Sequence, residues 1–422
     1  MAKFIRQRGT IDIYDVEALL YKRVLSACQN QAKLFNYTPI TTPTFESTSL
    51  FTRSTGETSD IVTKEMYDFK DKSGRDITLR PEGTAGVIRA IVENKLYAIN
   101  DLPLRYYYHG SFFRYERAQF GRYREFMQFG VEVVGSNSYL DDVQTVLLVT
   151  SILKELNIKD YKVRINTFGN VNCRNAHRDN VKNFFASHID NLCEDCKNRF
   201  EKNPLRILDC KVDKEYIEKL EIPVSLDALD EENRLVFDKI VDILKDNNVN
   251  YEIDKYLVRG LDYYTGTVYE TKLKEYPGIG SICSGGRYDN LAEYYTDKKL
   301  PGVGISIGLT RLFYQLREAG IIGENKAGCS DAIVVPMSDD YYEYIYKITN
   351  DMRKNDLSVN VCYIDKKFKN KMKYVNASNV KYAIIVGEDE ANNNYVMIKN
   401  MFEGTQEQVP FDQVSEYIKN NK

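Results

Sequence analysis

The chain has 422 residues, of which 43% are hydrophobic and 28% are charged, and its formal net charge at pH 7 is −3. This length allows two or three domains with separate cores, and the composition is ordinary for a globular protein. The sequence has no apolar run as long as a membrane span, no signal-peptide core at its N-terminus and no overall basic charge. We therefore expect a cytoplasmic protein without membrane contact, in which any nucleic-acid contact depends on local basic patches.

The N-terminal part is expected to hold a helix, an extended segment and a hairpin. Apolar residues at helical spacing predict an amphipathic helix over residues 14–36. Residues 37–46 contain two prolines, which cannot donate to a sheet ladder, so an edge strand or a subunit interface is favoured there. Alternating residues around a Gly-containing turn then predict a hairpin over residues 65–80.

A short polar segment introduces the next helix. The sequence PEGT at residues 81–84 precedes a helix that is predicted over residues 85–94. Glu82 and Thr84 stand just before this helix or at its start. In that position either residue can act as a helix cap and needs no further function.

The stretch from Leu104 to Gly135 reads as two strands joined by a charged loop over residues 116–124, because aromatic and β-branched residues dominate both flanks. Period-two alternation places one mixed set of side chains on a single face of the second strand: Phe126, Gln128, Gly130 and Glu132. Glu132 lies among valines, and a carboxylate in such surroundings usually has a partner. With Arg114 and Glu116 sharing a face nearby, we predict a pocket for an anion with polar ends; the alternative is a solvated hairpin.

The composition changes after this hairpin. Residues 139–155 predict a helix and residues 161–168 predict a strand. A charged and mainly helical region from about 170 to 250 then reads as an insertion into the first domain.

The cysteines of this insertion raise the question of a metal site. The chain has eight cysteines scattered along its length, so reduced thiols are favoured over a disulfide framework. Cys193 and Cys196 have the spacing of a zinc knuckle, but the second half of a four-ligand site is incomplete. Cys210 and Cys173, or His177, could complete it in space. Unpaired, reduced cysteines are the preferred interpretation, and the sequence assigns no metal site.

A second stretch with chemical character covers residues 257–270. Arg259 begins a turn that leads into a strand, and the adjacent aromatic residues Tyr263 and Tyr264 follow directly. This grouping of a guanidinium with two phenol rings is a candidate binding surface.

Two glycine-rich stretches come next. Residues 283–288 combine glycines, which permit close backbone approach, with Tyr288. Residues 302–312 predict a glycine-dotted strand that turns into a helix, with Arg311 in the first turns of that helix. Glycine spaced along a strand marks a place where a ligand or another backbone comes close.

After a linker near residues 320–329, strand and helix patterns alternate. Strands are predicted at residues 332–336, 358–362, 382–386 and 395–398, and helices at residues 339–355, 367–375 and 411–421. This alternation indicates a small α/β domain with a largely parallel sheet. It carries a basic run that fits a solvated helix face as well as a nucleic-acid surface: Lys366, Lys367, Lys369, Lys371 and Lys373.

Taken together, these stretches resemble class II aminoacyl-tRNA synthetases, and specifically the histidyl-tRNA synthetase family, over essentially the whole chain. The segment around Pro43 looks like class II motif 1, residues 113–126 like motif 2 and residues 302–312 like motif 3. Those three motifs alone would fit several class II enzymes. The specific signals are LVRGLDYYTGTVYE at residues 257–270 and SGGRYDNL at residues 284–291, which look like the two histidine-binding signatures of that family.

The resemblance implies a class II α+β catalytic domain over residues 1–325, in which helices flank a six-stranded antiparallel sheet and residues 170–250 form a helical insertion. It implies an α/β anticodon-binding domain over residues 330–422 and a homodimer formed through motif 1. The implied ligands are L-histidine, ATP with Mg²⁺ and tRNA-His, with no bound organic cofactor. The implied reaction joins the histidine carboxylate to the ATP α-phosphate with loss of pyrophosphate, and then transfers the histidyl group to the terminal ribose of the tRNA.

By the same resemblance, three arginines are the catalytic residues. Arg114 matches the motif 2 arginine that holds the α-phosphate, and Arg259 matches the cation that lies beside it. Arg311 matches the motif 3 arginine that packs on adenine and reaches the γ-phosphate. Phe126 would stack on the other face of adenine. The implied ATP site is Arg114, Glu116, Arg122, Phe126 and Arg311.

The resemblance also implies an amino-acid pocket and an acceptor-stem contact. The implied histidine-binding residues are Glu82, Thr84 and Gln128 for the α-amino end, Glu132 and Tyr264 for the imidazole nitrogens, and Tyr263 and Tyr288 for the pocket wall. Arg117 and Gln119 match positions that read the extra 5′ guanosine and the discriminator base of tRNA-His. Ala118 replaces the usual proline between them and Tyr115 replaces the usual histidine, so the loop departs from the family pattern at two positions.

Two related kinds of protein are the alternatives. The synthetase-like regulatory subunit of ATP phosphoribosyltransferase, a histidine-sensing binding protein, shares the catalytic fold but usually lacks the anticodon domain and keeps the signatures imperfectly. Here Arg114, Arg259 and Arg311 are all present, and residues 330–422 supply a further domain. A class II synthetase for proline or threonine is disfavoured by the stretches RGLDYYTG and GGRYD.

Overall fold

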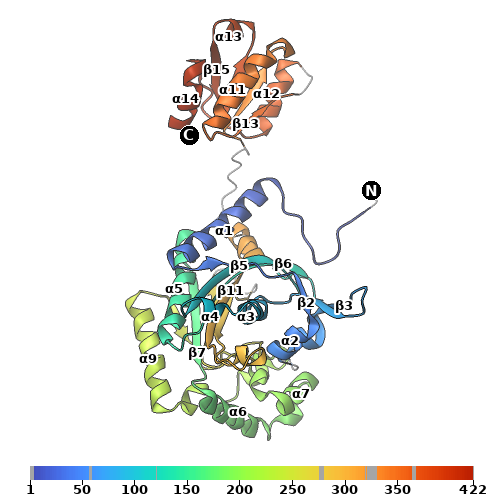
Figure 1. The fold of residues 1–422 in the computed structure, drawn as a ribbon, viewed down its shortest axis with the longest axis vertical. Coiled ribbons are helices and arrows are strands. Elements are labelled where there is room, and N and C mark those ends of the chain that lie inside the picture. Colours follow the sequence, from blue (N-terminus) through green and yellow to red (C-terminus); the bar gives the residue numbers. More distant parts are fainter. Residues whose placement is uncertain are drawn as a thin grey trace. The chain divides into compact units, whose positions relative to one another are not determined.

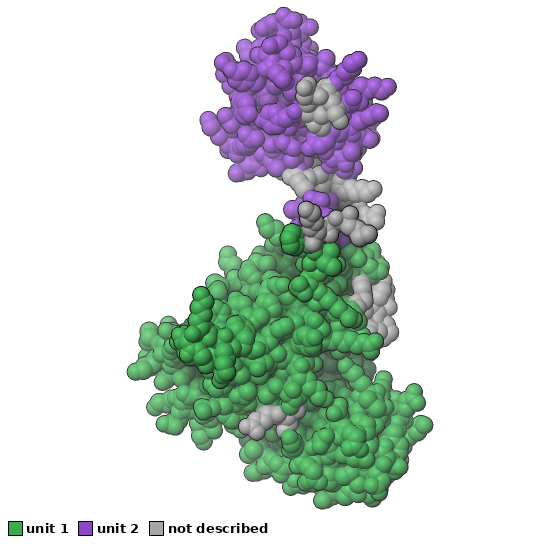
Figure 2. Space-filling view, turned by 90° about the vertical axis from the view of Figure 1, so that its right-hand side faces the viewer, with its two compact units in different colours: residues 1–12, 21–321 green, residues 13–20, 322–422 purple. Residues whose placement is uncertain are grey.

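The computed structural model describes residues 4–56, 59–119, 121–274, 280–318, 320, 330–363 and 367–421. Its internal contacts divide the chain into two compact units, residues 1–12 with 21–321 and residues 13–20 with 322–422 (Figure 2). The linker predicted near residues 320–329 lies outside the described residues, apart from Gly320.

A mixed sheet forms the centre of the first unit (Figure 1). Its strands are β1 (Thr38–Pro39), β5 (Leu104–Phe113), β6 (Glu125–Val134), β7 (Tyr161–Thr167), β8 (Tyr251–Ile253), β9 (Thr267–Leu273), β10 (Cys283–Arg287) and β11 (Gly302–Gly308). Within the described residues the strand order is β1-β5-β6-β11-β10-β9-β7-β8. The six inner strands are antiparallel to their neighbours, as expected. The sheet has two further short strands, β1 and β8, which lie at its two edges and pair in parallel with their neighbours.

Helices and a small sheet surround this central sheet. The helices are α1 (Asp15–Leu34), α2 (Thr48–Thr55), α3 (Thr84–Glu93), α4 (Leu96–Ile99), α5 (Tyr139–Glu155) and α10 (Leu309–Glu318). The strands β2 (Phe45–Ser47), β3 (Tyr67–Lys70) and β4 (Asp76–Leu79) form the order β2-β4-β3. The predicted helices at residues 14–36, 85–94 and 139–155 and the hairpin at residues 65–80 are thereby confirmed.

Helices α5 and α10 pack on the inner strands of this sheet. Helix α5 packs on β10 and β11, and α10 packs on β6 and β11. The N-cap Ser138 accepts a hydrogen bond from the Leu140 N–H at 3.3 Å, which satisfies one free donor of the first turn of α5. No helix in the described part of the chain is both long and apolar enough to cross a membrane.

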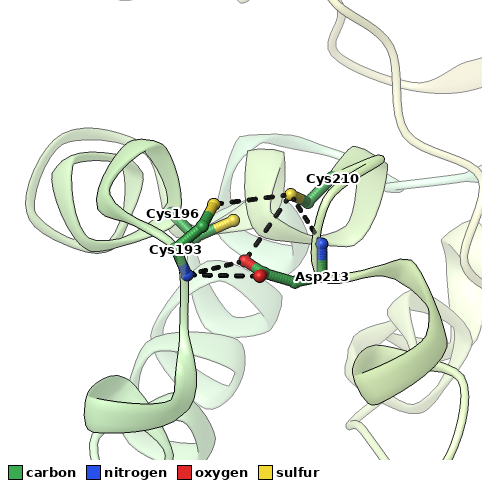
Figure 3. Close-up of side chains that lie close together, drawn as sticks. All are labelled: Cys193, Cys196, Cys210 and Asp213. Atoms are coloured by element: carbon green, nitrogen blue, oxygen red, sulfur yellow. Dashed lines mark hydrogen bonds between the residues drawn. The ribbon is translucent and has the colours of Figure 1, made fainter.

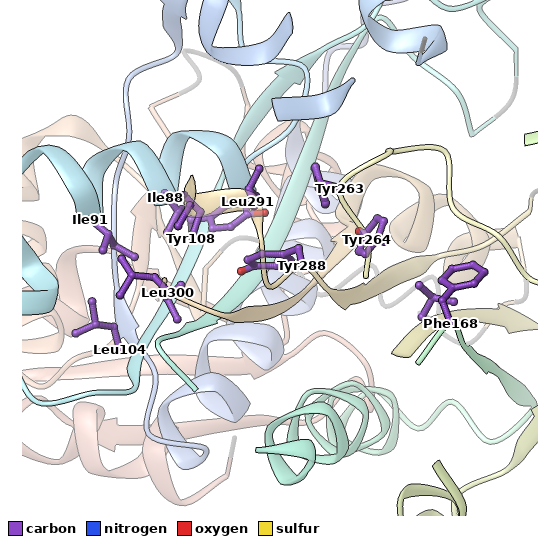
Figure 4. Close-up of a cluster of buried hydrophobic side chains, with 14 of the residues drawn as sticks. Ile88, Ile91, Leu104, Tyr108, Phe168, Tyr263, Tyr264, Tyr288, Leu291 and Leu300 are labelled. Carbon is purple, nitrogen blue, oxygen red and sulfur yellow. The ribbon is translucent and has the colours of Figure 1, made fainter. Parts of the chain in front are cut away.

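One large apolar cluster lies between α3 and the sheet. It includes Ile88 and Ile91 of α3, Leu104 of β5 and Leu291 and Leu300 (Figure 4). At one end this core becomes aromatic and carries hydroxyl groups, contributed by Tyr108, Tyr263, Tyr264 and Tyr288. The functional cavity described below begins at these rings.

The region between β7 and β8 is the mainly helical insertion. Its helices are α6 (Val171–Phe185), α7 (Glu194–Lys202), α8 (Lys214–Ile217) and α9 (Glu231–Asp246), with a 3-10 segment η3 (Pro204–Asp209) after α7. It has a buried core of its own, which includes Val181, Phe185, Phe200 and Ile207.

The second unit is built around a sheet in the order β13-β12-β14-β15-β16 within the residues described. The strands are β12 (Ala332–Pro336), β13 (Val359–Val361), β14 (Tyr382–Val386), β15 (Tyr395–Asn400) and β16 (Gln406–Pro410), and the helices are α11 (Tyr342–Lys354), α12 (Phe368–Ala377), α13 (Glu388–Asn392) and α14 (Val414–Asn420).

The prediction of a largely parallel sheet in this unit is correct for β13, β12 and β14 and wrong for β15 and β16. Strand β12 pairs in parallel with β13 and β14, but the β14–β15 and β15–β16 pairs are antiparallel. A parallel connection needs a crossover of a dozen or more residues. The connections at residues 387–394 and 401–405 are too short for a crossover, so the chain turns back beside the preceding strand.

The basic run of this unit is not a continuous surface. Lys371 is only 7% exposed, and its Nζ donates a hydrogen bond to the Pro336 carbonyl at 3.0 Å. Lys366 lies outside the described residues. Lys371 therefore serves the interior of the domain, and the interpretation of the run as one nucleic-acid surface is wrong at that position.

Candidate active site

A cavity of about 960 Å³ opens between the central sheet, the start of α3 and the insertion. Most residues singled out from the sequence line it: Glu82, Thr84, Arg114, Glu116, Arg122, Phe126, Gln128, Arg259, Tyr263, Tyr264, Tyr288 and Arg311. Phe126 and Gln128 come from the predicted face of β6. Glu132, Arg117 and Gln119 are not among the lining residues. The sequence therefore located the cavity, while three of its candidates lie outside the wall.

Glu82 caps helix α3 and also lines the cavity. Its carboxylate accepts hydrogen bonds from the backbone N–H groups of Thr84 and Ala85 at 2.7 and 2.8 Å. Burial raises the pKa of Glu82, and these N–H donors oppose the rise. The capping interpretation is thus correct, and it does not compete with a binding role because the same carboxylate lies at the cavity wall.

Glu132 lies just behind the wall in a cage of hydroxyl groups. Its carboxylate accepts hydrogen bonds from Thr84 Oγ1 at 2.7 Å, from the Tyr108 hydroxyl at 3.3 Å and from the Tyr288 hydroxyl at 2.5 Å. Burial raises its pKa to about 8, although the hydroxyl donors lower it. Gly304 lies opposite on β11, where an added Cβ would fall 1.8 Å from Glu132 Oε2. The glycine therefore makes room for the carboxylate.

Arg114 follows the last residue of β5. Its Nε donates to the Pro81 carbonyl at 2.9 Å, and its guanidinium carbon lies 5.4 Å from the centre of the Phe126 ring. The hydrogen bond holds the stem while the rest of the guanidinium faces the cavity. Arg114 and Phe126 therefore form a prepared surface for an anion next to an aromatic face.

Arg311 sits in the first turn of α10. Its Nη1 donates to the Ser281 carbonyl at 2.6 Å and its Nε to the Gly121 carbonyl at 3.2 Å. Burial and the neighbouring cations Arg122 and Arg114 together lower the pKa of Arg311 to about 10, although Glu116 opposes them. Glu116, which pairs with Arg122 Nη1 at 3.3 Å, offsets only part of the charge of these three guanidiniums, so the cluster favours the binding of a polyanion.

Arg259 is held by a carboxylate that sequence analysis missed. Its Nη1 lies 3.4 Å from Glu270 Oε2 on β9. The Glu270 carboxylate is also bound by Arg164 Nη1 at 2.7 Å, Lys272 Nζ at 2.9 Å and Ser281 Oγ at 2.6 Å. Burial opposes ionisation, but Arg259 and the other donors outweigh it and lower the pKa of Glu270 to about 2. The sequence signal that could have identified Glu270 is its position two residues before Lys272, since side chains at alternate positions of a strand share a face and these two have opposite charges.

The turn that carries Arg259 is also attached to the insertion. Arg206 of η3 is 4% exposed; its Nη1 donates to the Gly260 carbonyl at 3.1 Å and its Nη2 to Asp60 Oδ2 at 2.9 Å. Asn203 donates from Nδ2 to Asp262 Oδ1 at 2.7 Å. The central sheet thus holds this turn through Glu270, and the insertion holds it through Arg206 and Asn203.

Comparison with known proteins decides the family. The family model for histidyl-tRNA synthetase matches residues 9–312, and the anticodon binding domain model matches residues 331–421.

The chain belongs to the histidyl-tRNA synthetase family.

Relatives agree over the full length. The chain is 40% identical over 415 residues to the histidine–tRNA ligase of Geobacillus sp. (strain WCH70), with 98% of each chain covered. It is 38% identical over 413 residues to that of Lysinibacillus sphaericus (strain C3-41), covering 97% of this chain and 98% of the relative. The crystal structure of apo S. aureus histidyl-tRNA synthetase matches with a TM-score of 0.81 and 33% identity, over 99% of this chain and all of that one.

The motif 2 loop lines the cavity through Glu116 and Arg122, while Arg117 and Gln119 of the same loop lie outside the wall. Arg117 and Gln119 are exposed, and Phe120 lies outside the described residues. The Arg124 guanidinium lies 3.8 Å from the centre of the Tyr115 ring, and the Tyr115 N–H donates to the Glu65 carbonyl at 2.7 Å. Tyr115, one of the two departures from the family pattern, therefore fixes the base of the loop by stacking.

The proposed metal ligands of the insertion do not all come together. Cys173 lies with its Sγ 3.4 Å from Asp230, and His177 is buried with its ring stacked on Phe168. Neither belongs to the group formed by Cys193, Cys196, Cys210 and Asp213 (Figure 3). The completion by Cys173 or His177 that the sequence left open is wrong.

Proposed function

We propose that this chain is a histidine–tRNA ligase, which activates L-histidine with ATP to histidyl-adenylate and transfers the histidyl group to the 3′ end of tRNA-His. The observation that carries the proposal is one cavity in which Arg114, Arg259 and Arg311, from three separate elements, face a compartment of buried carboxylates and tyrosines. Full-length relatives with this name support it. Residues 1–325 would perform the chemistry and residues 330–422 would bind the anticodon.

The arginines fit the first step. A histidine carboxylate is already a nucleophile, so attack on the α-phosphate needs alignment and charge stabilisation more than a general base. Arg114 and Arg259 would hold the α-phosphate as negative charge develops on it. Arg311 and Arg122 would bind the outer phosphates and release them as pyrophosphate, while Phe126 stacks on adenine.

The carboxylates and tyrosines fit the amino-acid end. Glu82, Thr84 and Gln128 would bind the α-amino group, and Tyr263 and Tyr288 would line the side-chain pocket. When ionised, the Glu132 carboxylate offers about four acceptor sites, and three of them face hydroxyl donors.

Glu132 would accept a fourth hydrogen bond, from an imidazole N–H, and Tyr264 would serve the other ring nitrogen. An apolar side chain of similar shape would leave these groups unpaired, which explains selectivity for histidine.

Magnesium would enter with the nucleotide. Glu65 and Glu116 both line the cavity. Burial raises the pKa of Glu65, and the neighbouring Glu116 raises it further. Two carboxylates that disfavour each other's charge are suited to sharing a divalent cation with phosphate oxygens, and Mg²⁺ usually binds through one or two carboxylates in such sites. The bound Mg²⁺ would neutralise phosphate charge.

The remaining partners follow from the outer surfaces. Arg117 and Gln119, exposed on the motif 2 loop, would contact the acceptor end of tRNA-His. The proline-containing strand β1 lies at an edge of the sheet, and the surrounding motif 1 segment would form a homodimer interface. We place the enzyme in the cytoplasm, where its tRNA is aminoacylated.

The regulatory alternative is less supported. A histidine sensor needs no triphosphate site, yet Arg114, Arg259 and Arg311 all lie at the cavity. An anticodon-binding domain, whose family model matches residues 331–421, would also have no use in such a sensor.

The test is ATP–pyrophosphate exchange with histidine, proline or threonine. We expect exchange with histidine alone, reduced about 10²–10³-fold in Arg259→Ala, as for loss of one preorganised donor. The matched control is Lys272→Ala, which removes another cation from the same Glu270 carboxylate; it should retain exchange within about threefold, because Arg259 and Arg164 still pair with Glu270. Calorimetric binding of histidine without exchange for any amino acid would refute the ligase and favour the sensor.

A further inference from the structure

Three thiols and one carboxylate of the insertion meet at a single point. Their possible ligand atoms all lie within 4.8 Å of one another, and they belong to Cys193, Cys196, Cys210 and Asp213 (Figure 3). Cys193 Sγ is 3.8 Å from Cys210 Sγ, and Cys210 Sγ is 3.6 Å from Asp213 Oδ2. Among the described residues, no other group of three or more histidines, cysteines and acidic residues is so close.

These distances match those around one zinc ion. Ligands at Zn–S distances of about 2.3 Å in a tetrahedron lie roughly 3.8 Å from each other. A disulfide has a sulfur–sulfur distance of about 2.0 Å, so the Cys193–Cys210 separation of 3.8 Å is that of two unlinked ligands. Three of the four residues are shielded from water, since Cys196 is 0% exposed, Cys210 7% and Asp213 8%, while Cys193 is half-buried.

We propose that Cys193, Cys196, Cys210 and Asp213 bind a structural Zn²⁺ ion in a closed, four-ligand site. Three sulfurs and one carboxylate oxygen complete a tetrahedron, and soft thiolates select zinc over magnesium or calcium. On binding, each thiol loses its proton to solvent and no redox partner is needed. The fourth ligand, Asp213, follows Cys210 by three residues, which is the spacing that Cys193 and Cys196 also have.

Groups with positive charge lie close to the four proposed ligands. Cys193 is the N-cap residue of α7 and Cys196 lies in its first turn, where the backbone N–H groups carry partial positive charge. Arg199 of the same helix is half-buried, donates to the Arg206 carbonyl at 3.3 Å and is attracted by Cys196 and Cys210. The excess negative charge of three thiolates and one carboxylate around a divalent cation is thus partly offset.

The ion would fasten the segment that supports the catalytic turn. The two halves of the site lie before and after η3, so one ion closes the loop from Cys193 to Asp213. Inside that loop are Asn203 and Arg206, which hold Asp262 and the Gly260 carbonyl. Zinc therefore acts on positioning residues of the active site without touching substrate.

The experiment is metal analysis of untagged, full-length protein after loading with ZnCl₂ and removal of free metal. We expect about one zinc per chain, as a closed four-ligand site requires. Cys196→Ser should lower zinc content severalfold, and the matched control Cys173→Ser, a buried cysteine outside the cluster, should leave it unchanged. Hydrogen exchange of residues 203–213 and 259–262 should increase when a chelator removes the metal.

A second measurement does not depend on the folding of a variant. Wild-type protein loaded with CoCl₂ should show the intense thiolate-to-cobalt absorption and the visible bands of a tetrahedral site. Wild-type protein that retains no zinc and shows no such cobalt spectrum would overturn the proposal. So would equal zinc content in wild type and a folded Cys196→Ser variant, or a Cys193–Cys210 disulfide in freshly isolated protein. None of these results bears on ATP–pyrophosphate exchange, so the proposed ligase activity would stand even if the zinc proposal were overturned.

Discussion

The substitution Glu132→Gln should remove a large part of the pH dependence of stability in the first unit. Glu132 is 1% exposed, and burial raises its pKa from 4.5 to about 8. Because the folded-state pKa is above the unfolded value, the stabilising protonated form is fully present below pH 4.5 and is lost as pH rises through 8. Each pKa unit corresponds to about 1.4 kcal/mol, so up to about 5 kcal/mol depends on this proton.

The effect can be measured by scanning calorimetry. Between about pH 5.5 and pH 8.5 the wild type should lose about 3 kcal/mol through Glu132 alone, or about 6 °C in Tm at roughly 2 °C per kcal/mol. Glu132→Gln should lose much less over the same interval, because its amide does not titrate. Glu125→Gln, an exposed position at the start of the same strand, is the matched control and should behave as the wild type. Equal pH dependence in wild type and Glu132→Gln would refute the reasoning.

Three further outcomes are expected. Gly304→Ala should destabilise the first unit by about 1–3 kcal/mol in thermal unfolding, because its Cβ would meet Glu132 Oε2 at 1.8 Å. Gly308→Ala on the same strand, with its nearest contact at 3.6 Å, should cost less than half of that. Arg311→Ala should raise the KM for ATP at least tenfold in pyrophosphate exchange, with little change for histidine, since it removes a buried guanidinium from the polyanion site. Arg117→Ala should lower transfer to tRNA-His and leave pyrophosphate exchange unchanged, because the residue is exposed outside the cavity; equal losses in both assays would contradict that assignment.

The elements predicted best are those whose signal is local. The strands that became β5 and β6 and the helix that became α5 are specified by alternation or helical spacing within the segment itself. The two prolines of residues 37–46 indicated the edge position that β1 occupies, whereas β8 is three residues long and exists only through pairing with β7, so no local pattern predicts it. The prediction of parallel pairing failed for β15 and β16, because the direction of pairing depends on the connections between the strands and not on the strands themselves.

The candidate site shows the same division. Most residues that single-sequence patterns and the family resemblance singled out line the cavity, because each motif places its own side chains. What they did not give is the partner from another segment: Glu270 beneath Arg259, the three hydroxyls around Glu132, and Asp213 beside the cysteines. Likewise Lys371 looked like part of a basic surface until its contact with the Pro336 carbonyl placed it inside.

The attachment of the turn at residues 259–262 to both the sheet and the insertion has an energetic consequence. Any ligand that favours one position of the insertion also favours one position of Arg259, because Arg206 and Asn203 join the two. A displacement of the insertion relative to the central sheet must therefore either break these two hydrogen bonds or carry the turn at residues 259–262 with it.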